Sequence, residues 1–189
     1  LNATVSLTLP DKKIDARIDE IYADRFAIRV GKSNTPIARD PQQVEAIRLA
    51  LKSQFSIISG GPGTGKTSLM VNILRCLVRE GIPVSRIIMG APTGRAAQRM
   101  TETVQNNIAS IPELSAKDSA LLDLKGSTLH KILGYRSYQH EFYYRETNPL
   151  PASVVVVDEV SMVDVVMLDK FLQAIDPAQT KLILLGDKN

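Results

Sequence analysis

A glycine-rich segment, Gly60–Thr67, has the sequence Gly-Gly-Pro-Gly-Thr-Gly-Lys-Thr and fits the pattern G-x-x-x-x-G-K-[ST] of a phosphate-binding loop. Its glycines let the backbone curl so that several N–H groups face one anion, and a helix beginning near Gly65 would add its own free N–H groups. Lys66 would bring a positive charge to the β- and γ-phosphates, and the Thr67 hydroxyl would bind Mg²⁺. The segment predicts a nucleoside triphosphate site, with ATP and Mg²⁺ as the expected ligands. The loop residues expected at the nucleotide are Gly61, Pro62, Gly63, Thr64, Gly65, Lys66, Thr67 and Ser68.

Two acids, Asp158 and Glu159, directly follow the four valines Val154–Val157. Such a run is typical of a parallel strand that is buried on both faces. Asp158 would hold Mg²⁺, mostly through water, and Glu159 would orient and activate the attacking water as a general base. We expect Lys66 and Asp158 to meet at the tips of adjoining strands, within reach of one metal ion. Because the second acid is present, hydrolysis is favoured over nucleotide binding alone.

A third acid, Asp187, follows the apolar run Lys181–Leu185. It would lie where a γ-phosphate is sensed, and a plain turn is the alternative. Gln42 and Gln43 precede the first strand of the sheet, where a side-chain amide could contact an adenine edge or simply face solvent.

Other segments carry weaker signals. Thr93, Gly94 and Arg95 stand between a strand and a helix, where a hydroxyl and free backbone N–H groups could hold a nucleic-acid phosphate or serve only as a helix cap. Thr128 could likewise be a cap, and His130 a structural histidine. Aromatic residues gather in Tyr135–Tyr144, where they could stack on bases or pack as a hairpin on the domain.

These residues need elements to position them, and the hydrophobic pattern alternates between strands and helices from residue 55 onward. The expected strands are Phe55–Ser59, Arg86–Met89, Val154–Val157 and Lys181–Leu185. The expected helices are 11–25, 41–52, 67–80, 93–108 and 165–175, with two short helices in Leu114–Leu133 broken at Gly126. Residues 1–9 could form a short strand, Gly31–Arg39 a linker and Tyr135–Arg145 an irregular segment. The predicted fold is an α/β fold, a parallel sheet with helices on both faces.

Composition sets the class of protein. The chain has 189 residues, 44% of them hydrophobic, and a net charge of +3, which alone does not indicate nucleic-acid binding. Residues 51–100 are strongly basic and residues 150–189 acidic, which could serve phosphates and a metal respectively or could be solvated helix faces. Cys76, the single cysteine, is expected to be buried, and no apolar run approaches the ~20 residues of a membrane helix. We therefore expect a cytoplasmic protein without a membrane association. The chain begins at Leu1 and ends at Asn189 after an apolar run, so we also expect a fragment of a longer protein.

The order of these motifs resembles superfamily 1 helicases, and within them the RecD-like family of the exodeoxyribonuclease V alpha subunit. The resemblance spans about residues 37–189 and rests on a set of short segments. They are Arg39–Ile47, Ser59–Thr67, Ala91–Gln98, Ser127–Gly134, Asn148–Pro151, Val155–Asp164 and Leu182–Asp187. It implies a RecA-like motor domain at 37–189, truncated at its C-terminal end, with 1–36 as an N-terminal extension from a preceding domain.

The resemblance also assigns roles. It implies adenine recognition by Gln43, with Lys66 and Thr67 at the phosphates and Mg²⁺, and Asp158 and Glu159 at the metal and the water. It places Thr93, Gly94, Arg95, Thr128 and His130 in segments that track single-stranded DNA. It further implies 5′-to-3′ translocation and partner subunits of an exodeoxyribonuclease V complex, although the protein could also work alone.

Two positions depart from the family pattern, since Arg95 replaces a common Lys and Val160 a common Ala. In this family a second motor lobe brings arginines to the γ-phosphate. We therefore expect the isolated chain to bind Mg·ATP but to hydrolyse it weakly, without unwinding DNA. Two alternatives stay open: a phosphate-loop ATPase of another class (clamp-loader-like or regulatory) that does not act on DNA, and a nucleotide-binding assembly module without turnover.

Overall fold

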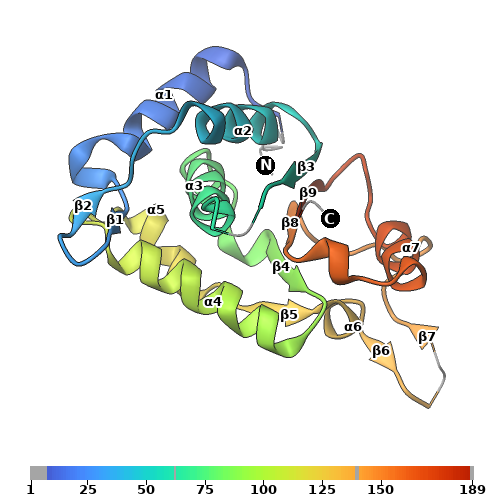
Figure 1. Ribbon diagram of the computed structural model, residues 1–189. Coiled ribbons are helices and arrows are strands. Elements are labelled where there is room, and N and C mark those ends of the chain that lie inside the picture. Colours follow the sequence, from blue (N-terminus) through green and yellow to red (C-terminus); the bar gives the residue numbers. More distant parts are fainter. Residues whose placement is uncertain (1–7, 62, 139–140, 188–189) are drawn as a thin grey trace.

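The computed structural model describes residues 8–61, 63–138 and 141–187, and its centre is a five-stranded parallel sheet (Figure 1). Across the sheet the strands are β3 (Phe55–Ser59), β9 (Lys181–Gly186), β8 (Val154–Val157), β4 (Ile87–Ala91) and β5 (Gly126–Thr128). Neighbouring strands pair in parallel throughout. The four strands expected from the sequence are thus confirmed, with bounds shifted by at most two residues.

Helices cover both faces of the sheet. One face carries α1 (Asp11–Tyr22), α2 (Pro41–Lys52), α3 (Lys66–Arg79) and α4 (Gly94–Ala109), and the other carries α6 (Leu129–Ile132) and α7 (Val165–Gln173) (Figure 1). The valines of β8 divide between the two layers: Val154 and Val156 pack with the first set, Val155 and Val157 with the second. This division follows from the alternation of side chains along a strand. The expected α/β fold with helices on both faces is confirmed.

Local capping explains where the helices that lead to the site begin. The side chain of Asp40 accepts a hydrogen bond from the Gln43 N–H at 2.9 Å, and Pro41 occupies the first position of α2. Thr93 caps α4 by accepting from the Ala96 N–H at 3.2 Å. Both starts agree with the sequence predictions.

The segment between α4 and β8 was predicted in part. Two short helices, α5 (Ala116–Ser119) and α6, lie on either side of Gly126 as expected, but a 3₁₀ turn (Ala120–Asp123) and the edge strand β5 between them were missed. Gly126 belongs to β5, where a Cβ atom would lie 2.5 Å from the Ala97 carbonyl oxygen of α4. The glycine therefore serves close packing of a helix on a strand, and a strand of three residues is too short to show a hydrophobic period.

Two small hairpins stand outside the main sheet. β1 (Arg29–Val30), just before the predicted linker, pairs with β2 (Thr35–Pro36) inside it, and β6 (Tyr135–Arg136) pairs with β7 (Glu141–Phe142) within the predicted irregular segment. The rings of Tyr135 and Phe142 lie 5.3 Å apart and both approach His130, so the hairpin alternative was the better one. The remaining 3₁₀ turns are Asp24–Phe26, Val84–Arg86 and Val160–Met162. The possible strand at residues 1–9 falls mostly outside the described residues.

Helix α1 shares the core of the sheet. Ile14, Ile18 and Ile21 are fully buried and belong to the same hydrophobic cluster as α2 and α3. Arg75 of α3 donates to the backbone carbonyls of Ile21 and Phe26, which ties the end of α1 and the following turn to the central helix. The domain boundary between residues 36 and 37 stays a prediction.

A buried lysine joins α2 to β9. The Lys181 ammonium, at the start of β9, donates to the carbonyl oxygens of Ala50 (2.7 Å) and Ser53, at the end of α2. These are carbonyls that a helix end leaves without intrahelical partners. Burial lowers the pKa of Lys181 to about 8. Cys76 is buried as expected, and burial raises the pKa of its thiol to about 12. Among the described residues, no helix is both long and apolar enough to cross a membrane.

Two buried arginines of α3 share one carboxylate. Asp118 of α5 is fully buried and accepts hydrogen bonds from Arg75 (3.3 Å) and from Arg79. Burial alone would raise the pKa of Asp118, but the hydrogen bond from Arg79 and the charges of both arginines hold it below its usual value. Removing this charge would leave two arginines in the core without their common partner.

We expect Asp118→Asn to lower the free energy of unfolding by about 3–5 kcal/mol, the usual effect of breaking a buried ion pair. Urea unfolding measures the change. Because folding lowers the pKa of Asp118, the loss is complete above the usual carboxyl pKa and shrinks as the pH falls below it. Asp123→Asn, an exposed control nearby, should change stability by less than about 0.5 kcal/mol. Equal stability of the two variants would show that the cluster contributes little.

Candidate functional site

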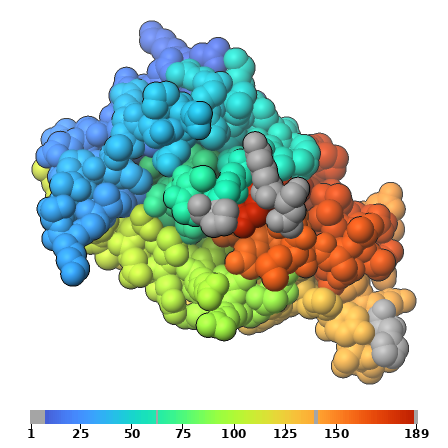
Figure 2. All heavy atoms as spheres, viewed as in Figure 1, coloured from blue at the N-terminus to red at the C-terminus, as the bar shows by residue number. Residues whose placement is uncertain are grey.

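The predicted site residues gather at the carboxyl ends of the parallel strands. The glycine-rich loop follows β3, Asp187 follows β9 and Asp158 follows β8. Strand β9 separates β3 from β8, so the prediction that the loop and Asp158 stand on adjoining strands is wrong. The order of strands in a parallel sheet depends on long-range pairing, which local sequence does not reveal. Figure 2 shows the face on which the loop (teal), α4 (lime green) and the segment after β8 (orange) come together.

The loop needs its glycines for backbone conformation and for space. Gly63 and Gly65 have φ angles of +76° and +78°, in the left-handed region. A Cβ atom on Gly65 would lie 2.9 Å from the Gln43 side-chain nitrogen, and that nitrogen donates to the Thr64 carbonyl oxygen at 3.2 Å. Gln43, predicted at the adenine, thus touches the loop directly. Pro62, also predicted at the nucleotide, lies outside the described residues.

Lys66 is held by three oxygen atoms. Its ammonium donates to the carbonyl oxygens of Gly60 (2.6 Å) and Gly61 (2.9 Å) and pairs with the Asp187 carboxylate at 2.5 Å. The Lys66 side chain is 16% exposed and that of Asp187 45% exposed, so the pair is open to solvent on one side. Asp187, which the sequence suggested either as a γ-phosphate sensor or as part of a plain turn, therefore lies beside the phosphate-binding loop.

The two acids after β8 have contrasting environments. Asp158 is half-buried, and burial raises its pKa, an effect opposed by the hydrogen bond from the Glu159 N–H (2.8 Å) and by the charge of Lys66. Glu159 has a φ of +54°, a left-handed conformation that costs a non-glycine residue on the order of 1–3 kcal/mol. Such strain is common where a side chain must be aimed at a particular point, because the surrounding structure holds it there.

One pocket of about 310 Å³ brings the predicted metal ligands together. Thr67, Asp158 and Glu159 line it on one side. Residues of α4 line the other side, namely Ala96, Arg99, Met100, Glu102, Thr103 and Asn106. Among the described residues no group of three or more His, Cys, Asp or Glu side chains could hold a metal ion. A hydroxyl and one carboxylate, completed by water and phosphate oxygens, are nevertheless the donor set that Mg²⁺ uses at triphosphates.

The α4 side of this pocket was missed by the sequence reasoning. Ala96, Met100 and Thr103 recur at helical spacing and mark one face of α4, and Arg99 lies beside it. That spacing was visible in the sequence. The packing of α4 beside α3, which turns this face toward Thr67, was not.

The residues predicted to contact DNA lie at the same sheet edge, beyond β8. Thr93 follows β4 and Thr128 ends β5, and both hydroxyls cap helices, Thr128 by accepting from the Lys131 N–H at 3.3 Å. Gly94 and Arg95 are exposed at the start of α4. The ring of His130 lies 5.9 Å from that of Tyr135. The capping alternative is thus confirmed for both threonines, and the role of these residues toward DNA stays a prediction.

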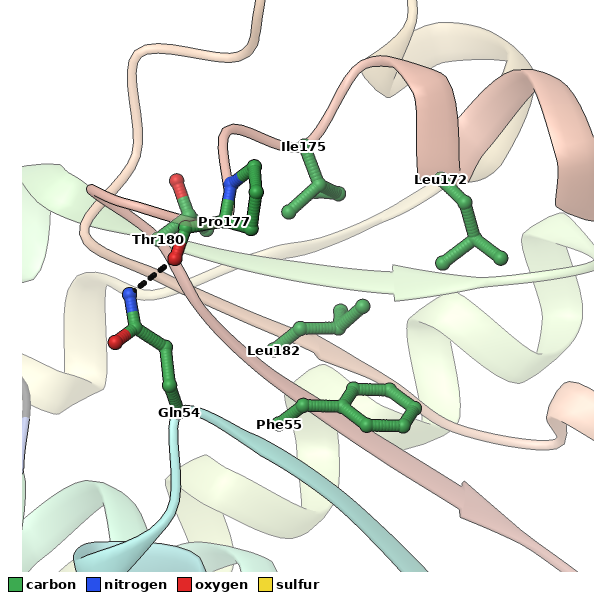
Figure 3. Close-up of a pocket in the computed structure, with 7 residues that line it drawn as sticks. All are labelled: Gln54, Phe55, Leu172, Ile175, Pro177, Thr180 and Leu182. Carbon is green, nitrogen blue, oxygen red and sulfur yellow. Dashed lines mark hydrogen bonds between the residues drawn. The ribbon is translucent and has the colours of Figure 1, made fainter.

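A second pocket, of about 320 Å³, has a different character. Gln54, Phe55, Leu172, Ile175, Pro177, Thr180 and Leu182 line it between β3 and α7 (Figure 3). Gln54 closes one end by donating to the Pro177 carbonyl oxygen at 2.5 Å. Phe55 and Leu182 lie near the starts of their strands, so this pocket is at the opposite edge of the sheet from Lys66. None of its lining residues carries a charge, so it does not suit a triphosphate.

The contact between Gln43 and Gly65 can be tested by stability. Gly65→Ala should cost about 1–2 kcal/mol for the left-handed backbone, plus the clash with Gln43. Gly63→Ala is the matched control, since its φ is similar but no atom lies within 4 Å of the added Cβ. Urea unfolding should show the larger loss for Gly65→Ala, and adding Gln43→Ala should remove the excess. Equal losses for the two alanine variants would contradict the contact.

Comparison with known proteins places the chain. A family model described as an AAA domain matches residues 43–189. The RecBCD enzyme subunit RecD of Haemophilus influenzae is 41% identical over 149 residues, which cover 77% of this chain and 23% of that protein. RecD of Mycolicibacterium smegmatis is 39% identical over 151 residues (77% and 27%), and the ATP-dependent RecD2 DNA helicase of Deinococcus radiodurans is 29% identical over 183 residues (94% and 22%). The chain thus spans 22–27% of the length of these relatives.

Solved structures agree on the fold. The UvsW helicase from bacteriophage T4 superposes with a TM-score of 0.64 at 13% identity, over 94% of this chain and 60% of that one. The large terminase of bacteriophage HK97 superposes with a TM-score of 0.58 at 20% identity, over 90% and 37%. Together with the sheet and its loop, these likenesses establish a RecA-like phosphate-loop fold. The chain belongs to the AAA domain family matched over residues 43–189, and its similar relatives include RecD proteins.

Proposed function

We propose that this chain is the nucleotide-binding and hydrolysing lobe of a DNA helicase of the RecD type, with Mg·ATP as its fuel. The observation that carries the proposal is the meeting of Thr67, Asp158 and Glu159 in one pocket, beside a loop that holds Lys66. The similarity to RecD subunits and to an ATP-dependent RecD2 DNA helicase supports DNA as the nucleic acid along which the protein moves.

In this proposal the loop N–H groups and Lys66 bind the β- and γ-phosphates, and the phosphates compete with Asp187 for the ammonium. Thr67 and Asp158 hold Mg²⁺, which supplies positive charge to the phosphate oxygens. Glu159 accepts a proton from water as the water oxygen bonds to the γ-phosphorus. The bond from that phosphorus to the bridging oxygen then breaks, and ADP and phosphate are the products.

Gln43 is proposed to recognise adenine. Its side-chain nitrogen is already engaged by the Thr64 carbonyl, which fixes the amide. Its side-chain oxygen is buried and has no hydrogen-bond partner among the described residues. An acceptor held in this way suits the exocyclic amino group of adenine, because an unpaired buried acceptor is costly.

Single-stranded DNA is proposed to run past Thr93, Gly94, Arg95, Thr128 and His130. Exposure of Gly94 and Arg95 at the start of α4 supports phosphate binding there, where helix N–H groups and a guanidinium are available. Movement in the 5′-to-3′ direction, and work either within an exodeoxyribonuclease V type of complex or alone, follow from the RecD resemblance.

Replacing Glu159 with Gln tests the hydrolysis step in the full-length protein. We expect ATP turnover to fall by about 10²–10⁴-fold, the usual contribution of a general base, while nucleotide affinity stays nearly unchanged. Steady-state phosphate release and equilibrium binding measure the two effects. Loss of nucleotide binding would instead assign Glu159 a structural role.

DNA dependence separates a helicase from other phosphate-loop ATPases. Single-stranded DNA should stimulate the ATPase of the full-length protein, with affinity that falls steeply as salt rises. Arg95→Ala should weaken DNA binding and leave the DNA-free rate intact, because Arg95 does not line the Thr67 pocket. If single-stranded DNA does not change the ATPase rate of the full-length protein, the helicase proposal is wrong, but nucleotide hydrolysis is not excluded.

A further inference from the structure

Arg99 of α4 is a cation whose position has no structural explanation. It is exposed at the rim of the pocket that Thr67 and Glu159 line. Among the described residues, no carboxylate lies within ion-pair distance of its guanidinium, and no hydrogen-bond acceptor contacts it. The buried arginines of α3 differ, because Arg75 and Arg79 both pair with Asp118. Five N–H donors are therefore free at the edge of the site.

The pocket beside Arg99 corresponds to one end of the proposed triphosphate. In the proposed function Thr67 would hold Mg²⁺ at the terminal phosphates, and Glu159 would face the water that attacks the γ-phosphorus. Space enclosed by Thr67 and Glu159 is therefore on the γ-phosphate side. Gln43, proposed at the adenine, is not among the residues that line this pocket.

The lining of the pocket holds more carboxylates than cations, so it favours an anion that binds together with a metal ion. Asp158, Glu159 and Glu102 contribute carboxylates, and Arg99 is the only cation among the described residues of the lining. Lys66, the other cation nearby, is engaged by Asp187 and two carbonyls. Mg²⁺ would offset the carboxylates, and the planar guanidinium could then bind two phosphoryl oxygens at once.

We propose that Arg99 is a further phosphate-binding residue of the site, which contacts the γ-phosphoryl group and, after cleavage, the orthophosphate product. The inference rests on the proposed function. Thr103 and Asn106, on the same face of α4, line the continuation of the pocket and offer polar atoms to the departing phosphate. Because α4 begins at the residues proposed to meet DNA, Arg99 also gives that helix a direct contact with the nucleotide.

Equilibrium binding of Mg·ATP and Mg·ADP to the 189-residue chain tests the inference without requiring turnover. Arg99→Ala should weaken Mg·ATP binding about tenfold and leave Mg·ADP binding unchanged, since only ATP has the γ-phosphoryl group. The Mg·ATP affinity of Arg99→Lys should lie between that of Arg99→Ala and that of the parent chain, because lysine keeps the charge without the planar guanidinium. Gln98→Ala, at the exposed neighbour of Arg99 on α4 and outside the pocket lining, is the control and should bind both nucleotides normally.

The outcomes separate the inference from the function on which it rests. If Arg99→Ala binds Mg·ATP as tightly as the parent chain, or loses Mg·ATP and Mg·ADP equally, the γ-phosphate contact is wrong while the nucleotide site stands. A parent chain that binds neither nucleotide overturns the proposed function itself. Thermal unfolding of each variant without nucleotide checks that the fold is intact, as expected for an exposed side chain.

Discussion

The parallel pairing of β9 between β3 and β8 fixes the spacing of every charged group in the site. Residues of β3 are in register with Leu182–Gly186 of β9, and those of β8 with Lys181–Leu184. The loop, Asp187 and Asp158 leave three consecutive strands at one edge as a result. Each interstrand step is a few ångströms, so Asp187 reaches Lys66 directly and Asp158 experiences the charge of Lys66 at longer range. With β9 in the middle, Asp187 is the carboxylate that pairs with Lys66.

The buried helix α3 anchors the phosphate-binding loop, because it begins at Lys66. Every residue from Leu69 to Arg79 is buried, so the helix that starts at Lys66 is enclosed by α1, α2, α4 and α5. Two arginines at such positions require a shared anion and backbone acceptors, which Asp118, Ile21 and Phe26 provide. The N-terminal helix is therefore part of what holds the loop helix in place, whatever larger unit it belongs to.

Local chemistry was readable from the sequence, and long-range geometry was not. The loop glycines, the acids after the valine run and the caps at Asp40 and Thr93 are each set by neighbours in the chain, and the structure agrees with them. Strand order is decided by pairing between segments that are distant in the chain, as when β9 pairs with β3, so the position of β9 could not be foreseen. The same holds for Arg99, because which face of α4 meets Thr67 depends on helix packing. The break at Gly126 was foreseen but its strand was not, since a glycine needed for a close approach looks like a glycine that separates two helices.

At Glu159 the left-handed backbone lowers the stability of the fold, while the proposed activity needs the side chain at this position. Glycine would adopt this φ without strain, so a sequence selected only to be stable would carry glycine here. Such a chain would lose the carboxylate that the proposed reaction needs. The strain is thus a cost met by the rest of the fold, in the trade-off that often separates stabilised variants from active ones. Engineering this domain for greater thermal tolerance should leave that residue untouched and seek its gains elsewhere.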